Sequence, residues 1–383
     1  MVGTVILGAR RTPVGGMNGD LADVPAPQLA AVAIRAALED ANTEASAVDE
    51  VIIGCVLPAG IGQAPARQAA LAAGLPNAAP CTTINKMCGS GLKAIMQADD
   101  AIRAGRIRCA VAGGMENMSR APHLFAARRG LRLGDGMMLD HLLHDGLRDA
   151  FEGELMGVYA QRTADSCGFS RGEMDDFAVE SLRRAKACRH DDIAPVNVGG
   201  KKPATITQDE LPQKADISRI PQMRPAFAKD GTITAANSSA ISDGAAALIL
   251  SADDGGGSDN ILAHIRAQAT FAAKPAEFTL APIGALRAVL QKAKWRADEV
   301  DLFEINEAFA VVTMAAMREF SLPHARVNVC GGACAIGHPV GASGARVVST
   351  LLNALRAAGK YRGVAALCIG GGEAVAVAIE RPH

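Results

Sequence analysis

A cysteine followed by small residues stands in the segment Asn-Lys-Met-Cys-Gly-Ser-Gly at residues 85–91. Cys88 comes directly before a stretch with helical spacing. Unpaired backbone N–H groups and the dipole at the start of a helix stabilise a thiolate, so the segment predicts a nucleophile. The structural alternative is a small buried thiol at a tight turn, the commoner role of an unselected cysteine.

A second segment surrounds one histidine with small residues, Cys-Gly-Gly-Ala-Cys-Ala-Ile-Gly-His-Pro-Val-Gly-Ala-Ser-Gly-Ala-Arg at residues 330–346. Gly and Pro restrict the backbone around His338, which could be the general base for a cysteine. The alternative is a histidine satisfied by nearby carbonyls. Cys330, Cys334 and His338 are spaced by four residues, as metal ligands on one face of a helix would be. Zinc sites of this kind need a fourth ligand, and the glycines after Cys330 would break the helix that aligns the three side chains.

Two more segments could supply polar groups. Cys368 ends an apolar run and is followed by Ile and three glycines, whose N–H groups can point at an anionic oxygen. Asn306, in Glu-Ile-Asn-Glu-Ala-Phe-Ala at residues 304–310, could hold a water or an oxyanion. The structural alternatives are a flexible strand end with a core cysteine, and a helix N-cap.

The surrounding pattern is that of an α/β protein with a mostly buried sheet, because short β-branched runs alternate with Ala-rich helical stretches. Strands are expected at residues 4–7, 50–53, 109–112, 246–250, 301–305 and 364–369. Helices are expected at residues 27–40, 91–103, 282–294, 308–320 and 343–358.

A faint internal repeat has a nearly constant offset of roughly 250 residues. The matching pairs are residues 35–38 with 287–290, 48–49 with 300–301, 90–95 with 343–348, and 113–114 with 370–371. Four matches in the same order indicate two copies of one α/β unit. Residues 119–241 differ in composition and show no sustained buried-strand pattern, so they are expected to be an insertion on the first copy. Ligands gather beyond the carboxyl ends of strands, so the chemistry should lie where the strand-end loops of both copies meet.

Composition restricts the classes of function. A chain of 383 residues with 49% apolar and 21% charged residues should fold as two or three domains, and is neither disordered nor a small disulfide-stapled module. The formal net charge of −1 gives no overall field that attracts nucleic acid or an anionic membrane. Ten Phe, two Tyr and one Trp are too few for base-stacking platforms, so neither nucleic acid nor membrane is an expected partner.

The nine cysteines are scattered and odd in number, which predicts reduced thiols in a cytosol-like compartment. No basic residue precedes the short apolar stretch near the first residue, and no uncharged apolar run reaches the length of a membrane span. A cytoplasmic location is therefore expected.

Taken together, the four segments resemble the motifs of the thiolases, the acyl-CoA acetyltransferases of 3-ketoacyl-CoA metabolism. They occur in the family's order, and the resemblance runs from Arg-Thr-Pro at 11–13, through 113–119 and 237–244, to the last strand. It implies a duplicated thiolase-like α-β-α-β-α layered fold with an inserted loop domain. Its parts would be an N-terminal half (1–118 plus 242–266), the inserted domain (119–241) and a C-terminal half (267–383).

The resemblance also implies catalytic roles. Cys88 would take the acyl group and His338 would activate it. Cys368 would protonate the leaving carbanion or CoA thiolate in one direction and deprotonate the acetyl methyl in the other, because a Claisen condensation needs a base besides the acylated cysteine. One oxyanion would be bound by the N–H groups of Cys88 and Gly370, and the other by His338 with a water held by Asn306.

Substrate contacts follow in the same way. Ser239 matches a residue that contacts the CoA pantetheine, and Met156 matches one that lines the acyl pocket. Phe309, in the Asn-Glu-Ala-Phe motif, is also expected to bind the substrate. Coenzyme A would enter as substrate and product, with acyl-CoA as the partner. No tightly bound cofactor and no metal is implied.

Several positions depart from the family pattern and leave the acyl chain length and the physiological direction open. Leu155 stands where acetoacetyl-CoA enzymes often have His, whereas residues 278–282 resemble the pocket loop of some of those enzymes. Ala236 and Ala240 replace common glycines, which could reshape the pantetheine approach. Glu373 follows the glycine triplet, which puts anion binding there in question.

Three alternatives remain beside a thiolase. A decarboxylating ketosynthase would lack the second thiol, and a non-catalytic acyl-CoA or lipid-binding module would not need two thiols and a histidine. A nicotinamide-dependent oxidoreductase would use the G-x-G-x-x-A pattern of Gly89, Gly91 and Ala94 with Glu116. Residues 120–150, with His141 and His144, resemble the family's assembly and cover loop, so a homodimer or homotetramer is expected.

Overall fold

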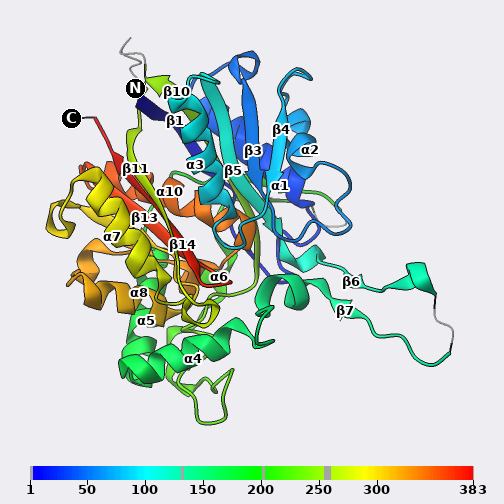
Figure 1. Cartoon of the computed structure of the whole chain (residues 1–383), viewed down its shortest axis with the longest axis vertical. Coiled ribbons are helices and arrows are strands. Elements are labelled where there is room, and N and C mark those ends of the chain that lie inside the picture. The colour runs from blue at the N-terminus through cyan, green and yellow to red at the C-terminus, as the bar shows by residue number, and fades with distance from the viewer. Residues whose placement is uncertain (1–2, 131–132, 201–202, 254–259, 383) are drawn as a thin grey trace.

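The computed structural model describes residues 3–130, 133–200, 203–253 and 260–382. Within them, one mixed sheet has the strand order β12-β13-β14-β11-β1-β10-β5-β3-β4, with β2 paired to β10 (Figure 1). The strands are β1 (Gly3–Arg11), β2 (Gly15–Gly16), β3 (Glu50–Gly54), β4 (Cys81–Ile84), β5 (Cys109–Asn117), β10 (Ser242–Asp253), β11 (Ala263–Ala272), β12 (Leu302–Ile305), β13 (Arg362–Ile369) and β14 (Glu373–Glu380).

The sheet has the same order on both sides of its centre, where β1 pairs antiparallel with β11. Outward from β1 come β10, β5 and β3, and outward from β11 come β14, β13 and β12. Both halves also share a local hydrogen-bonding pattern, in which an aspartate binds two successive backbone N–H groups. Asp49 accepts hydrogen bonds from the backbone N–H groups of Arg108 and Cys109, and Asp301 accepts them from Tyr361 and Arg362. The internal repeat is therefore a duplicated structural unit.

Helices cover both faces of each half. The helices of the two units are α1 (Ala26–Asp40), α2 (Pro65–Ala72), α3 (Ser90–Arg103), α7 (Ala281–Ala293), α8 (Ala310–Glu319), α9 (Ala333–Ile336) and α10 (Val340–Ala357). In β5, Val111 packs in the core with α1, whereas its neighbours Ala110 and Ala112 pack in the core that holds α3 and α10. Strand β13 alternates likewise, with Ala366 facing α7 and Leu367 facing the α3 and α10 side. The predicted α-β-α-β-α layering is confirmed.

The two central helices cross at paired glycines. A Cβ on Gly91 of α3 would lie 2.8 Å from the backbone nitrogen of Ala345, and a Cβ on Gly344 of α10 would lie 2.2 Å from that of Leu92. Because Cβ atoms are not tolerated this close to backbone, only glycine lets the two helices approach this closely. The same pair matched in the internal repeat, so the crossing lies at the centre of the duplication.

The segment between β5 and β10 contributes smaller elements: β6 (His123–Leu124), β7 (Leu139–Asp140), a π-helix (Leu142–Leu147), α4 (Met156–Cys167), α5 (Arg171–Ala187), β8 (Val196–Val198), β9 (Ala204–Ile206) and α6 (Glu210–Lys214). Short 3-10 turns lie at Ala45–Ala47, Met118–Arg120, Ala127–Arg129, Ile217–Gln222, Pro275–Glu277, Ala297–Glu299 and His324–Arg326. Strands β6 and β7 lead into a ribbon that extends away from the body of the molecule (Figure 1). The boundary expected after residue 266 lies inside β11, which pairs with both β1 and β14.

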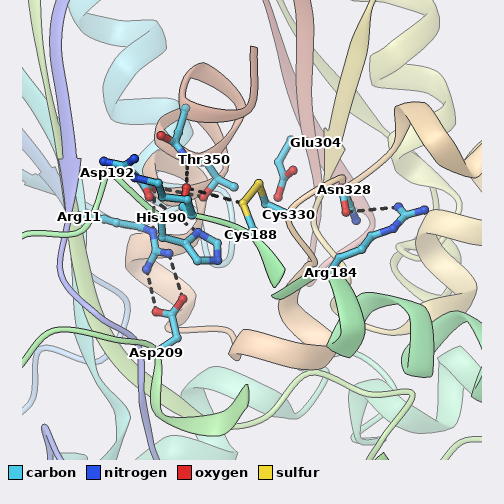
Figure 2. Close-up of a disulfide and its surroundings, with 12 residues drawn as sticks. Arg11, Arg184, Cys188, His190, Asp192, Asp209, Glu304, Asn328, Cys330 and Thr350 are labelled. Atoms are coloured by element: carbon cyan, nitrogen blue, oxygen red, sulfur yellow. Dashed lines mark hydrogen bonds and ion pairs between the residues drawn. A yellow bond between two sulfur atoms is a disulfide. The ribbon is translucent and has the colours of Figure 1, made fainter. Parts of the chain in front are cut away.

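A disulfide joins Cys188, which follows α5, to Cys330, in the loop before α9 (Figure 2). Their Cα atoms lie 5.1 Å apart although 142 residues separate them in sequence. The prediction that every cysteine is a reduced thiol is therefore wrong for this pair, because the inserted segment folds back onto the C-terminal unit. No helix among the described residues is long and apolar enough to cross a membrane.

The disulfide should stabilise the folded chain. By restricting the unfolded state across 142 residues, it is worth up to about 5 kcal/mol. A reductant is expected to lower the melting temperature of the wild-type protein by several degrees, as measured by differential scanning fluorimetry. Cys188→Ser should melt at the lower temperature with or without reductant, and Cys167→Ser, which removes a free thiol, serves as the control. Equal melting temperatures for the oxidised and reduced wild-type protein would contradict the stabilisation.

Candidate active site

A cavity of about 400 Å³ lies where the two units meet the inserted segment. Every predicted site residue except Asn306 lines it, namely Met156, Ser239, Phe309, Cys88, His338, Cys368 and Gly370. Asn306 is fully buried at the end of β12. The cavity thus collects groups that are up to 282 residues apart in sequence, from Cys88 to Gly370.

A tight turn between β4 and α3 presents Cys88. The Ser90 hydroxyl donates to the carbonyl of Met87 at 2.7 Å and accepts from the N–H of Lys86 at 2.8 Å. Met87 has a φ of 47°, in the left-handed region that side chains rarely adopt. This strained turn places Cys88 two residues before α3, with its sulfur at the cavity.

The Cys88 thiol is not a preformed thiolate. Burial raises its pKa to about 11, although the N–H of Gly370 donates to the sulfur and works in the opposite direction. The nearby Glu116 carboxylate raises the pKa further. The sequence predicted a thiolate stabilised by the helix start, but desolvation outweighs that effect here. Cys88 therefore needs a base when it reacts.

The loop that holds Gly370 is tied to the Cys88 loop by an ion pair. The Lys86 ammonium pairs with the carboxylate of Glu373, and both side chains are partly exposed. Glu373 is one of the departures from the family pattern, and the structure accounts for it because its charge is matched by Lys86. The pair connects the strand-end loops of the two units beside the cavity.

His338 can act as that base. Ser343 Oγ donates to the Pro339 carbonyl at 2.9 Å, so it accepts from His338 Nδ1, which lies 2.6 Å away. This places the proton on Nδ1 and leaves a lone pair on Nε2, which is buried with no hydrogen-bond partner among the described residues. Burial, aided by the Arg346 cation, lowers the pKa of His338 to about 3. The ring is therefore neutral at pH 7.

Two further predicted side chains are Cys368, which faces the cavity, and Asn306, which lies two residues before the cavity-lining Ala308. Cys368, at the end of β13, lines the cavity, and burial raises its pKa, with Cys88 adding to the effect. Cys368 is therefore a neutral thiol at pH 7. Asn306 has its Nδ2 buried without a hydrogen-bond partner within the described part of the chain. Unpaired buried donors are rare, and one beside a reaction site is available to bind a water or a reacting oxygen.

Glu116 positions the site, a role that the sequence did not reveal. Its buried carboxylate accepts hydrogen bonds from the N–H groups of Val56, Leu57 and Gly341. These contacts fix the first turn of α10, three residues after His338, to the loop after β3. Burial raises the pKa of Glu116 to about 7. Its signal in the sequence was an acidic residue inside an otherwise apolar strand end.

The alternative sites read from the sequence do not form. Cys330 is bonded to Cys188, Cys334 donates to the carbonyl of Glu307, and His338 contacts Ser343. Among the described residues, no group of three or more His, Cys, Asp or Glu could hold a metal ion. Gly91 packs against α10, and Glu116 is occupied by backbone N–H groups, so the dinucleotide pattern has no room for its ligand.

The rest of the cavity wall is mostly apolar, and much of it was missed in the sequence. Residues of the inserted segment that line it include Leu143, Leu147, Leu155 and Phe227, joined by Phe278 of the C-terminal unit. A Cβ on Gly157 would lie 2.3 Å from the Phe227 ring, so α4 must begin with glycine there to let the ring pack. The resemblance had singled out Leu155 and residues 278–282, whereas Leu143, Leu147 and Phe227 lie in a segment without a regular hydrophobic period, so no pattern pointed to them.

Comparisons with known proteins agree with this geometry. Residues 4–254 match the model described as "Thiolase, N-terminal domain" and residues 259–381 match "Thiolase, C-terminal domain". The chain is 45% identical over 392 residues to proteins named "Acetyl-CoA acetyltransferase" from Pseudomonas aeruginosa and Escherichia coli. It is 42% identical over 392 residues to a "Probable acetyl-CoA acyltransferase" from Staphylococcus aureus. Each alignment covers 100% of both chains.

The raised pKa of Cys88 predicts how its alkylation depends on pH. Because the thiolate is the nucleophile and the pKa is about 11, the rate of modification by iodoacetamide should rise nearly tenfold per pH unit from pH 7 to 10. Peptide mapping by mass spectrometry would follow Cys88 alone, with glutathione as the reference thiol that levels off earlier. A plateau for Cys88 below pH 8 would show a low-pKa thiolate instead.

Proposed function

Because the chain belongs to the thiolase family, we propose that it is an acetyl-CoA acetyltransferase that works through an acyl-Cys88 intermediate. It would condense two acetyl-CoA to acetoacetyl-CoA, or cleave a 3-ketoacyl-CoA with CoA. The observation that carries the proposal is the meeting of two neutral thiols and one neutral imidazole on a single apolar cavity.

In the first half-reaction, His338 Nε2 takes the proton of Cys88 as the sulfur attacks the thioester carbonyl. Charge develops on the carbonyl oxygen, and the N–H groups of Cys88 and Gly370 are the donors proposed to receive it. The hydrogen bond from Gly370 to the Cys88 sulfur supports this, because it places that donor beside the attacking atom. The CoA thiolate leaves and takes up the proton of Cys368, which becomes a thiolate, while His338 keeps the proton of Cys88 on Nε2.

In the second half-reaction, the Cys368 thiolate left by that proton transfer would remove a proton from the methyl group of a second acetyl-CoA. The resulting enolate oxygen is proposed to accept hydrogen bonds from His338 Nε2–H and from a water held by Asn306 Nδ2. The two buried nitrogens without partners support this assignment. The carbanion then attacks the acyl group and forms the new carbon–carbon bond. Cys88 leaves as a thiolate and takes its proton back from His338, while Cys368 keeps the proton of the methyl group.

The substrate contacts remain part of the proposal. Ser239, Met156 and Phe309 line the cavity, in keeping with roles beside the pantetheine and acyl portions of a CoA thioester. CoA acts here as substrate and product, and no tightly bound cofactor is proposed. The three-part division into residues 1–118 plus 242–266, 119–241 and 267–383 also stays a proposal.

We propose that the chain assembles as a homodimer or homotetramer. The ribbon between β6 and β7 carries exposed apolar side chains, since Met137 is 78% and Met138 is 61% exposed. Such a patch is costly in water unless another surface covers it. Light scattering should give a mass above that of one chain, and Met137→Asp with Met138→Asp should shift it downward. A monomeric wild-type protein would contradict the assembly.

The cytoplasmic location predicted from the cysteines is likewise a proposal. Seven cysteines are free in the structure. The Cys188–Cys330 bond is the observation against it, since disulfides are rare in reducing compartments.

Mass spectrometry of acid-quenched protein tests the mechanism. Acetyl-CoA alone should add one acetyl group to Cys88. Cys368→Ala should still acetylate but lose condensation by at least about 10²-fold, because only the second half-reaction needs its base. Cys334→Ala, a free thiol outside the cavity wall, should keep both half-reactions. Active enzyme with an unmodified Cys88 would refute the intermediate, and equal loss of both steps in Cys368→Ala would refute its assigned role.

A further inference from the structure

Arg346 is almost completely buried next to the candidate site. It lies one and a half turns into α10, is 1% exposed, and belongs to no part of the cavity wall. Its Nη1 donates to the Glu304 carboxylate at 2.8 Å, and its Nη2 donates to Asn306 Oδ1 at 3.0 Å. The guanidinium therefore bridges a buried carboxylate and the amide proposed to hold a water.

The hydrogen bond from Arg346 fixes the orientation of the Asn306 side-chain amide. A guanidinium only donates hydrogen bonds, so the oxygen of the amide must face Arg346 and the nitrogen must point the other way. The backbone of Asn306 is fixed separately, because its N–H donates to the carbonyl of Ala366. Without Arg346, nothing else bonded to Oδ1 among the described residues would keep the amide from turning over.

Glu304 explains why the cation is stable in the interior. Its carboxyl group is 2% exposed and pairs with Arg346, since a buried charge without a partner would be very unfavourable. Burial raises the pKa of Glu304 to about 8, and the Arg346 cation works in the opposite direction by favouring the carboxylate. The Glu304 carboxylate bonds to Arg346 Nη1, and the Asn306 amide bonds to Nη2, so the two partners use different nitrogens of the guanidinium. Glu304 therefore offers a variant that disturbs the same ion pair and leaves the amide contact in place.

We propose that Arg346 is a positioning residue, which orients the Asn306 carboxamide so that its N–H groups face the reacting oxygen beside His338. The inference rests on the proposed function, because it requires that Asn306 contributes to enolate stabilisation. Its effect should fall on condensation and not on acylation of Cys88, which uses the N–H groups of Cys88 and Gly370.

A mutant cycle on the full-length protein tests the proposal. Arg346→Lys can reach one of the two partners, and Arg346→Met can reach neither. Relative to wild type, kcat for condensation should fall about 10-fold in Arg346→Lys and about 10²-fold in Arg346→Met. KM for acetyl-CoA and the rate of Cys88 acetylation should each stay within about threefold, since neither step uses the Asn306 amide and burial, the larger cause of the lowered His338 pKa, remains when the Arg346 cation is removed.

The decisive measurement repeats both changes in an Asn306→Ala background. If Arg346 acts through Asn306, the double variants should have the kcat of Asn306→Ala alone. A further multiplicative loss would overturn the proposal. Glu304→Gln keeps an acceptor for Arg346 and should retain kcat within about threefold, so a loss equal to that of Arg346→Met would assign a merely structural role to the ion pair.

Two measurements keep the outcomes separate. Circular dichroism melts would restrict the comparison to folded variants, and Arg346→Lys retains the buried charge if Arg346→Met does not fold. A wild-type protein that neither condenses acetyl-CoA nor cleaves a 3-ketoacyl-CoA with CoA would refute the proposed function itself. An active wild type whose Arg346 and Asn306 effects multiply would refute only the positioning role.

Discussion

The close crossing of α3 and α10 is the contact on which the site depends. Cys88 lies two residues before α3 and His338 lies two residues before α10. Because Gly91 and Gly344 allow backbone-to-backbone approach near both helix starts, the cysteine and the histidine proposed as nucleophile and base are brought to one place. Replacing either glycine would push these two groups apart before it affected any residue that touches a substrate.

Electrostatics at the crossing follow from burial. A thiol with a pKa near 11 and an imidazole with a pKa near 3 share a cavity in which neither is charged at rest. Forming an ion pair there is unfavourable until a polar substrate and the surrounding N–H donors can stabilise it. In the proposed mechanism, reaction therefore depends on the fixed donors, on the amide held by Arg346 and on the backbone anchored by Glu116, more than on any intrinsic reactivity of Cys88.

The sequence predicted much of this and missed specific parts. The repeat of about 250 residues and the four motifs located both units, the central helices and every cavity-lining thiol or histidine named above. Strands β11 and β14 were missed, because Arg266 and Gln268 interrupt the first and alanines dilute the second. The ionisation of Cys88 could not be read either, since it depends on how deeply a turn is buried, and the Cys188–Cys330 bond depends on chain reversal across the inserted segment.

The duplication has left two dissimilar halves around one centre. Counting back from the matched Ser90 and Ser343, the position of Cys88 corresponds to Gly341, whose N–H is taken by Glu116. One copy of the repeated helix start thus carries the proposed nucleophile, whereas the other carries a glycine at the matching position, with the proposed base His338 three residues before it. Each chain consequently holds one proposed reaction centre. Neither half alone contains both Cys88 and His338. If the two halves were encoded as separate chains, activity would require the two chains to bind each other.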